Sequence, residues 1–96
     1  MHAVSLLRFE WDPAKGAANL RKHGVSFEDA RSVFSDENAR LIDDPDHSSE
    51  EERFVLLGLS NSLRVLVVAH CYRSAGGVVR IISARRASRT EERSYP

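Results

Sequence analysis

The chain of 96 residues lacks the residues on which several common classes of protein depend. Cys71 is its only cysteine, so no intrachain disulfide can form and a four-cysteine metal site is excluded. No apolar run approaches the roughly 18 residues that a membrane span requires, and residues 1–7 are too short and too weakly apolar for a secretory signal. We therefore expect a cytoplasmic protein with no membrane association that folds as one domain over residues 1–96.

Lysine is also scarce, because only Lys15 and Lys22 are found among the 14 basic residues and the other twelve are arginine. Basic and acidic residues balance to a net charge of zero, but residues 28–52 carry a formal −8 and residues 73–96 a formal +4. Planar guanidinium groups bind phosphate or carboxylate oxygens in pairs. A GC-rich genome would explain the arginine bias equally well, so the positions of the arginines must decide between the two explanations.

Capping residues predict three helices. The first begins after Asp12, with Pro13 at its first position, and ends at Gly24. The second begins after Ser26, which has an acidic residue three positions later, and a short third helix begins after Ser88 with the same spacing. Helical periodicity places four residues on one polar stripe of the first helix: Lys15, Asn19, Lys22 and His23.

Apolar runs predict the strands. Residues 6–11 alternate as a first strand, residues 40–43 form a short second one, and the runs 54–59, 65–69 and 78–82 are separated by tight turns. The order β-α-α-β-β-β-β-α predicts an α+β fold in which two N-terminal helices pack on a small antiparallel sheet. The strands are apolar on both faces, so we expect helices on one face and a partner or cleft on the other.

Standard catalytic motifs are missing from the sequence. There is no glycine-rich phosphate loop, no H-E-x-x-H, no CxxC and no G-x-S-x-G. His23, His47, His70 and Cys71 have irregular spacings, so we expect no metal site and no cofactor. His70 is interpreted as a half-buried strand histidine, and Trp11 and the phenylalanines as core residues.

Arg80 stands inside an otherwise apolar strand, where a cation without a partner would cost several kcal/mol. Two alternatives remain open: a salt bridge to one of the glutamates Glu50–Glu52, or an anion-binding cleft. Strand alternation predicts Arg80 on one face and Arg85 on the other. The residues predicted to share the face of Arg80 are Val78, Ile82 and Ala84.

Five sequence blocks together resemble the BrnT family of bacterial toxins. The blocks follow the family order and span nearly the whole chain: Phe9–Asp12, Asn19–Ala30, Glu51–Phe54, Arg80–Ala87 and Glu91–Tyr95. The resemblance implies a compact RelE-like ribonuclease that acts on RNA without a metal. It also implies a BrnA-like antitoxin that binds and neutralises the toxin and supplies the only DNA contact, in an assembly that includes a dimer of toxin–antitoxin heterodimers as one option.

The residues and the resemblance together suggest roles in RNA cleavage. Arg53 and Arg80 are assigned to the phosphate, and Lys22 or His23 to proton transfer. Arg85 is predicted to position substrate or to hold the third helix. The acidic cluster is predicted to orient the arginines, with Glu51 and Glu52 as its supporting members. Each residue also has a plain structural alternative, because Lys22 and His23 could cap helix carbonyls and Arg53 could form a surface ion pair.

Two other functions compete with RNA cleavage. A non-catalytic module that acts only through a protein partner would also use the segregated charges of residues 28–52 and 73–96. A DNA-binding regulator is disfavoured because the third helix mixes Arg89 and Arg93 with Glu91 and Glu92, which would repel phosphate.

Overall fold

The computed structural model describes residues 7–44 and 52–96. The elements follow the predicted order, with one 3-10 turn added after the second helix. Their bounds are β1 Arg8–Glu10, α1 Pro13–His23, α2 Phe27–Ser32, η2 Val33–Ser35, β2 Arg40–Ile42, β3 Phe54–Leu59, β4 Val65–Arg73, β5 Val78–Arg86 and α3 Arg89–Arg93. The predicted α+β class is confirmed.

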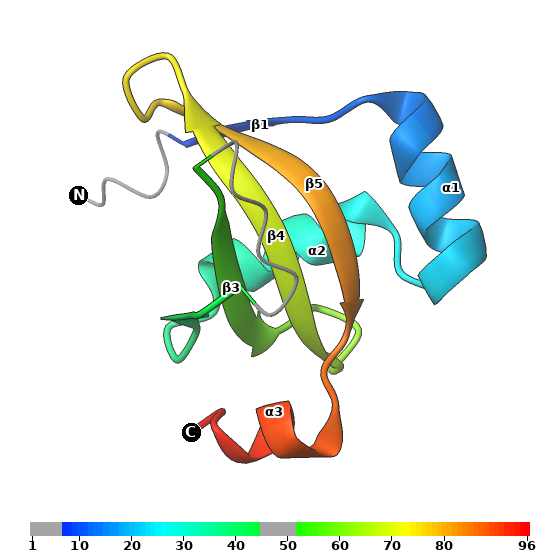
Figure 1. Cartoon of the computed structure of the whole chain (residues 1–96), viewed down its shortest axis with the longest axis vertical. Helices are drawn as coiled ribbons and strands as arrows, with labels where there is room; N and C mark the ends of the chain where they lie inside the picture. Colours follow the sequence, from blue (N-terminus) through cyan, green and yellow to red (C-terminus); the bar gives the residue numbers. More distant parts are fainter. Residues whose placement is uncertain (1–6, 45–51) are drawn as a thin grey trace.

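The sheet has five strands in the order β1-β5-β4-β3-β2 (Figure 1). Strands β2 to β5 pair in antiparallel fashion, as predicted, whereas β1 pairs parallel to β5 and makes the sheet mixed. The parallel pair arises because the chain passes through both N-terminal helices and three strands before β5 returns beside β1. The long strands β4 and β5 each extend four residues beyond their predicted ends, at 69 and 82, to Arg73 and Arg86.

The helix ends agree with the predicted caps. The Asp12 side chain accepts a hydrogen bond from the Ala14 amide at 2.9 Å, and Gly24 ends α1 in the left-handed region with φ 71°. At α3 the capping box is complete, because Ser88 accepts from the Glu91 amide while the Glu91 carboxylate accepts from the Ser88 amide.

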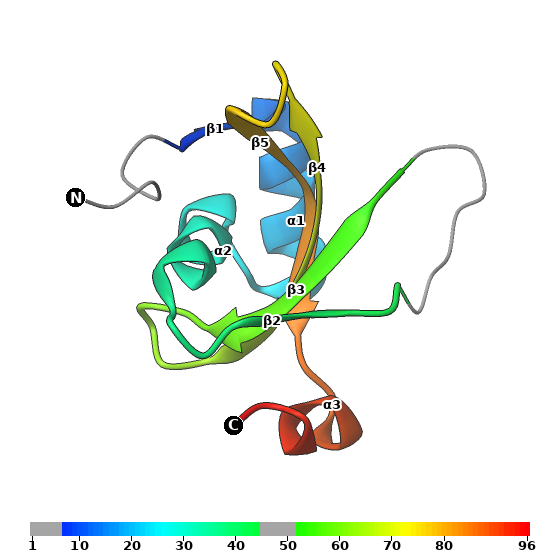
Figure 2. The same ribbon diagram turned by 90° about the vertical axis from the view of Figure 1, so that its left-hand side faces the viewer.

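The main core lies between the sheet and the two N-terminal helices. Figure 2 shows α2 on one side of β4 and β5, with α3 apart at the end of the sheet. Alternate residues of β4 face this core and the opposite face of the sheet. The core cluster contains Val25, Phe27, Ala30, Val33, Leu66, Val68, Val79, Ile81 and Ala84, and Trp11 and Phe34 pack against it as predicted.

A second, smaller cluster occupies the face of the sheet that α1 and α2 leave uncovered. Val55, Leu57, Val67 and Ala69 form it, and Tyr95 packs against it from the C-terminal segment. The hydroxyl of Tyr95 donates to Asp36 at 2.7 Å, which fastens the chain end after α3 to the turn before β2. We call this side the open face of the sheet.

Strand alternation breaks in β5. Ala69 pairs with Ser83 but the next residue of β4, His70, pairs with Ile81, so Ile82 is an extra residue in the ladder. Ala84 therefore lies in the core cluster with Val79 and Ile81, and the prediction that it shares a face with Arg80 is wrong. The prediction that Arg85 lies on the opposite face from Arg80 is wrong for the same reason.

Candidate active site

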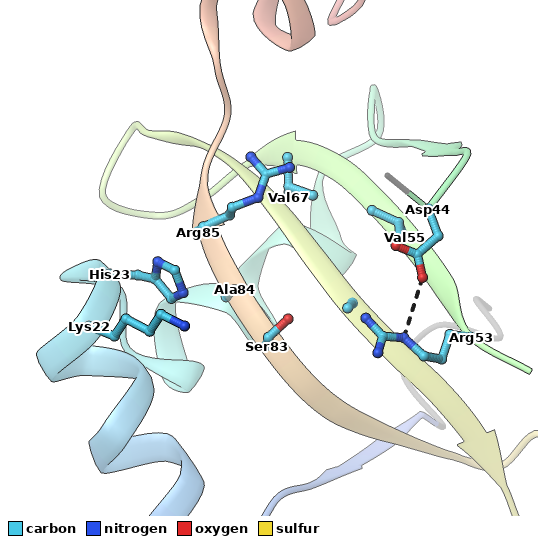
Figure 3. A pocket seen from close by; sticks show the side chains of 10 residues that line it. Lys22, His23, Asp44, Arg53, Val55, Val67, Ser83, Ala84 and Arg85 are labelled. Atoms are coloured by element: carbon cyan, nitrogen blue, oxygen red, sulfur yellow. Dashed lines mark ion pairs between the residues drawn. The ribbon is translucent and has the colours of Figure 1, made fainter. Parts of the chain in front are cut away.

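The open face carries a hollow of about 240 Å³ that we call the cationic pocket (Figure 3). Its walls come from the end of α1, the segment after β2, and strands β3, β4 and β5. The lining residues are Lys22, His23, Asp44, Arg53, Val55, Val67, Ala69, Ser83, Ala84 and Arg85. Four of the five predicted cationic site residues therefore share one cavity.

Lys22 and His23 form the wall at the end of α1. Other groups bond the backbone at Leu20 and Gly24: the Gly24 amide donates to the Leu20 carbonyl at 2.8 Å, and Arg64 donates to the Gly24 carbonyl at 3.1 Å. Neither the Lys22 side chain nor the His23 side chain makes a hydrogen bond or ion pair with a residue in 7–44 or 52–96. Figure 3 shows both side chains directed from the helix toward β5. They are exposed to the pocket and do not serve as caps.

Asn19 joins the α1 wall to the β5 wall, and it was not recognised from the sequence as more than part of a polar stripe. The residue is buried, with only 7% of its surface exposed. Its amide nitrogen donates to the carbonyls of Val25 and Ala84 at 2.9 and 2.8 Å, and its amide oxygen accepts from the Ala84 amide at 3.1 Å. Ala84 lies between Ser83 and Arg85, so Asn19 sets the width of the pocket.

Arg53 projects into the pocket from the residue before β3. Its Nε lies 3.4 Å from Oδ2 of Asp44, and its side chain is 21% exposed. At this distance the two side chains form an ion pair but not a hydrogen bond. The Nε atom is buried and makes no hydrogen bond with a described residue. The predicted surface ion pair is thus a largely buried one, in which a carboxylate neutralises the guanidinium from one side. Sequence reasoning missed Asp44 because nothing in the pattern connects it to Arg53.

Arg85 reaches the pocket from the far end of β5. It donates two hydrogen bonds to Glu91, from Nη1 and Nη2, each at 2.8 Å. This pairing lowers the pKa of Glu91 to about 2 against an opposing desolvation effect. The alternative that Arg85 holds the third helix is therefore confirmed, and the same side chain also lines the pocket beside Val67 (Figure 3).

Arg80 lies outside the cationic pocket. Its Nη1 donates to Oε2 of Glu10 on β1 at 2.9 Å. The described carboxylate that pairs with Arg80 is therefore Glu10, which does not line the pocket, and not the predicted Glu52. Glu52 is exposed and makes no ion pair with a described residue, whereas Glu51 lies outside the described residues. The carboxylates that hold the predicted arginines are Asp44, Glu10 and Glu91.

His70 belongs to the core and not to the site. It is fully buried, its Nδ1 lies 3.1 Å from the Val68 carbonyl, and its ring packs against Phe34, Phe54 and Tyr72. Burial lowers its pKa. It is more deeply buried than predicted. Across residues 7–44 and 52–96, no group of three or more His, Cys, Asp or Glu residues is placed to hold a metal ion.

The fold and the pocket define a class: a small α+β domain with helices on one face of the sheet and a cationic pocket on the other. A family model described as the ribonuclease toxin, BrnT, of type II toxin-antitoxin system matches residues 11–91. The chain belongs to the BrnT family of ribonuclease toxins. The predicted resemblance is thereby confirmed, and membership implies an antitoxin partner and an RNA target.

One solved structure supports the fold independently. The crystal structure of the Brucella abortus ribonuclease toxin BrnT matches this chain with a TM-score of 0.65 and 24% identity, over 86% of this chain and 99% of that one. No curated protein matches the chain. No helix of the described part of the chain has the length and apolar character needed to cross a membrane.

Proposed function

We propose that this chain is a metal-independent endoribonuclease toxin that cleaves RNA in the cationic pocket. One observation carries the proposal: Lys22, His23, Arg53 and Arg85, from three separate segments, surround one cavity in which Asp44 is the only acidic residue among the described lining residues. Such a cavity suits a phosphoryl group that gains negative charge during reaction. Membership of a ribonuclease toxin family supports this assignment.

In the proposed reaction the 2′-hydroxyl of a nucleotide attacks the adjacent phosphorus and the 5′-oxygen of the next nucleotide leaves. The products are a 2′,3′-cyclic phosphate and a free 5′-hydroxyl. Arg53 would stabilise the extra charge on the phosphoryl oxygens, because Asp44 holds its guanidinium at the pocket wall and leaves the outer N–H groups facing inward. Arg85 would contribute a second positive charge or position the substrate from the opposite end.

Either Lys22 or His23 is the proposed proton carrier. A base must accept the proton of the 2′-hydroxyl and an acid must supply one to the leaving oxygen. A histidine side chain ordinarily exchanges a proton near neutral pH, whereas a lysine supplies fixed charge more readily. His23 is thus the better candidate for proton transfer, and Lys22 for charge stabilisation.

Purified protein and a short RNA in EDTA would test the proposal. We expect cleavage to a 2′,3′-cyclic phosphate, and no cleavage where the attacking nucleotide is 2′-deoxy. Arg53→Gln should reduce kcat about a hundredfold, from the loss of about 3 kcal/mol of transition-state stabilisation. The matched control is Arg31→Gln on α2, in the helix layer on the other face of the sheet. Cleavage that requires added metal, or a folded Arg53→Gln protein that cleaves at the parent rate, would contradict the proposal.

The antitoxin is the second component of the proposed function. We propose a BrnA-like protein that neutralises the toxin and supplies the only DNA contact, with a dimer of heterodimers as one option for the assembly. Co-expression with the product of the neighbouring gene should restore growth. An Arg53→Gln toxin that no longer inhibits growth but still binds that protein would favour an enzyme over a module that acts only through its partner.

A further inference from the structure

Two arginines share one carboxylate oxygen at the end of the open face nearest β1. Oε2 of Glu10 accepts a hydrogen bond from Arg80 Nη1 at 2.9 Å and lies 3.4 Å from Arg73 Nε. Arg73 and Arg80, which we call the arginine pair, come from β4 and β5 near the turn that joins these strands.

The arginine pair carries more positive charge than its partner neutralises. Within residues 7–44 and 52–96, Glu10 is the only acidic side chain that forms an ion pair with Arg73 or Arg80, so these three described side chains sum to one net positive charge. The two arginine side chains are 56% and 31% exposed. Exposed ion pairs stabilise a fold by 1 kcal/mol or less, so a second arginine on one oxygen adds little to folding stability. Most of their N–H donors make no hydrogen bond with a described residue.

The open face connects the arginine pair directly to the cationic pocket. Arg80 pairs in register with Cys71, which lies two residues along β4 from Ala69 in the pocket wall. Residues two apart on a strand point to the same face and are about 7 Å apart. Extending the β3–β4 register by one residue from the Phe54–His70 pair places Arg53 beside the same Cys71. Arg80 and Arg53 therefore lie on either side of β4 on one surface, and Arg73 lies on β4 itself, two residues beyond Cys71.

We propose that Arg73 and Arg80 form a second phosphate subsite, which binds a phosphate of the RNA chain next to the one cleaved in the cationic pocket. The inference rests on the proposed function and adds to it the path of the substrate along β4. A single-stranded RNA presents phosphates in series, and a groove with guanidinium groups at intervals follows such a backbone. Glu10 orients the two guanidinium groups and leaves their remaining donors to the phosphate.

The salt dependence of RNA binding tests the subsite without requiring cleavage. The probe is a 2′-O-methyl RNA oligonucleotide, in which the attacking hydroxyl is blocked, measured by fluorescence anisotropy at several salt concentrations. Each phosphate contact with single-stranded nucleic acid contributes about 0.7 to the slope of log affinity against log salt. We expect the variant Arg73→Gln/Arg80→Gln to bind at least about tenfold more weakly and to lose about 0.7 of that slope.

Two further variants keep the interpretation specific. Arg73→Gln alone leaves the Arg80–Glu10 hydrogen bond in place, so this variant should fold even if the double variant does not. It should show a smaller loss of affinity and of salt slope. Arg31→Gln removes one positive charge from the helix layer, as Arg73→Gln does from the arginine pair, and should retain the parent slope. On unmodified RNA, the double variant should raise KM more than it lowers kcat.

The outcomes separate this subsite from the proposed function. Parent affinity and slope in the double variant would overturn the subsite, and so would a collapse of kcat with unchanged affinity, which would place Arg80 at the reacting phosphate. A parent protein that does not bind the oligonucleotide would also overturn it. A parent protein that binds but does not cleave unmodified RNA would instead overturn the ribonuclease assignment.

Discussion

Replacing Asn19 with alanine should destabilise the fold and separate the two walls of the pocket. The side chain makes three hydrogen bonds: two cross from α1 to the backbone of Ala84 on β5, and the third reaches the Val25 carbonyl between α1 and α2. Alanine would leave the Ala84 amide, the Ala84 carbonyl and the Val25 carbonyl without these partners in a buried position. Water enters such a site poorly, so unsatisfied groups there are costly.

The size of the effect follows from the number of bonds. At about 1 kcal/mol of net stabilisation for each, three hydrogen bonds contribute about 3 kcal/mol. A loss of that size is a large part of the 5–15 kcal/mol that is typical of small domains. It corresponds to a fall in Tm of about 12–24 °C for a chain of this length.

Urea unfolding followed by circular dichroism would measure the loss, and hydrogen exchange of the Ala84 amide would locate it. The control is Asn61→Ala, because Asn61 is exposed and its backbone amide, which the substitution keeps, donates to the Ser32 hydroxyl. Asn19→Asp keeps the acceptor but places a carboxylate against two carbonyls, so at pH 7 it should be at least as unstable as Asn19→Ala. If Asn19→Ala unfolds within 0.5 kcal/mol of the parent, then the idea that Asn19 joins the two walls is wrong.

Three further changes test ion pairing and packing in the fold. Glu91→Gln should cost about 1–2 kcal/mol at pH 7 by urea unfolding, because Arg85 holds the pKa of Glu91 at about 2; the difference should fade as pH drops from about 4.5 toward 2. Burial lowers the pKa of His70, so parent stability should fall as pH drops below 6.5, and this dependence should flatten in His70→Phe. Gly58→Ala should lose about 1–3 kcal/mol because its Cβ would stand 2.7 Å from a core valine methyl, whereas Gly77→Ala, with its nearest contact at 3.4 Å, should unfold close to the parent midpoint.

Local signals in the sequence predicted most of the fold. Asp12, Ser26 and Ser88 mark helix starts because a cap needs only its own side chain and amides two or three residues away. The strand runs were also recognisable, since β-branched residues buried on both faces leave a continuous apolar pattern. The parallel pairing of β1 was not predictable, because it depends on where β5 returns after the whole chain between them has folded.

The site was only partly predictable from the sequence. Family motifs brought forward Lys22, His23, Arg53 and Arg85, which the structure gathers in one cavity. Glu51 and Glu52 were predicted to support the arginines, but Glu51 lies outside the described residues and Glu52 makes no ion pair with a described residue. The described carboxylates that pair with Arg53, Arg80 and Arg85 are Asp44, Glu10 and Glu91. Opposite charges pair through space, and Glu10 is separated from Arg80 by 70 positions along the chain.

The extra residue in β5 explains why one of the four pocket cations could not be placed by periodicity. An uninterrupted strand would direct Arg85 into the helix-covered core, where a charged side chain has no water and the Glu91 carboxylate is out of reach. Because Ile82 bulges, Ser83 and Arg85 both line the open face while Ala84 turns inward to Asn19. The bulge at Ile82 thus places Ser83 and Arg85 in the pocket wall. It also places the backbone amide and carbonyl of Ala84 where Asn19 of α1 can bond them. Strand periodicity carries no sign of that bulge, since Ile82 is as apolar as its neighbour Ile81.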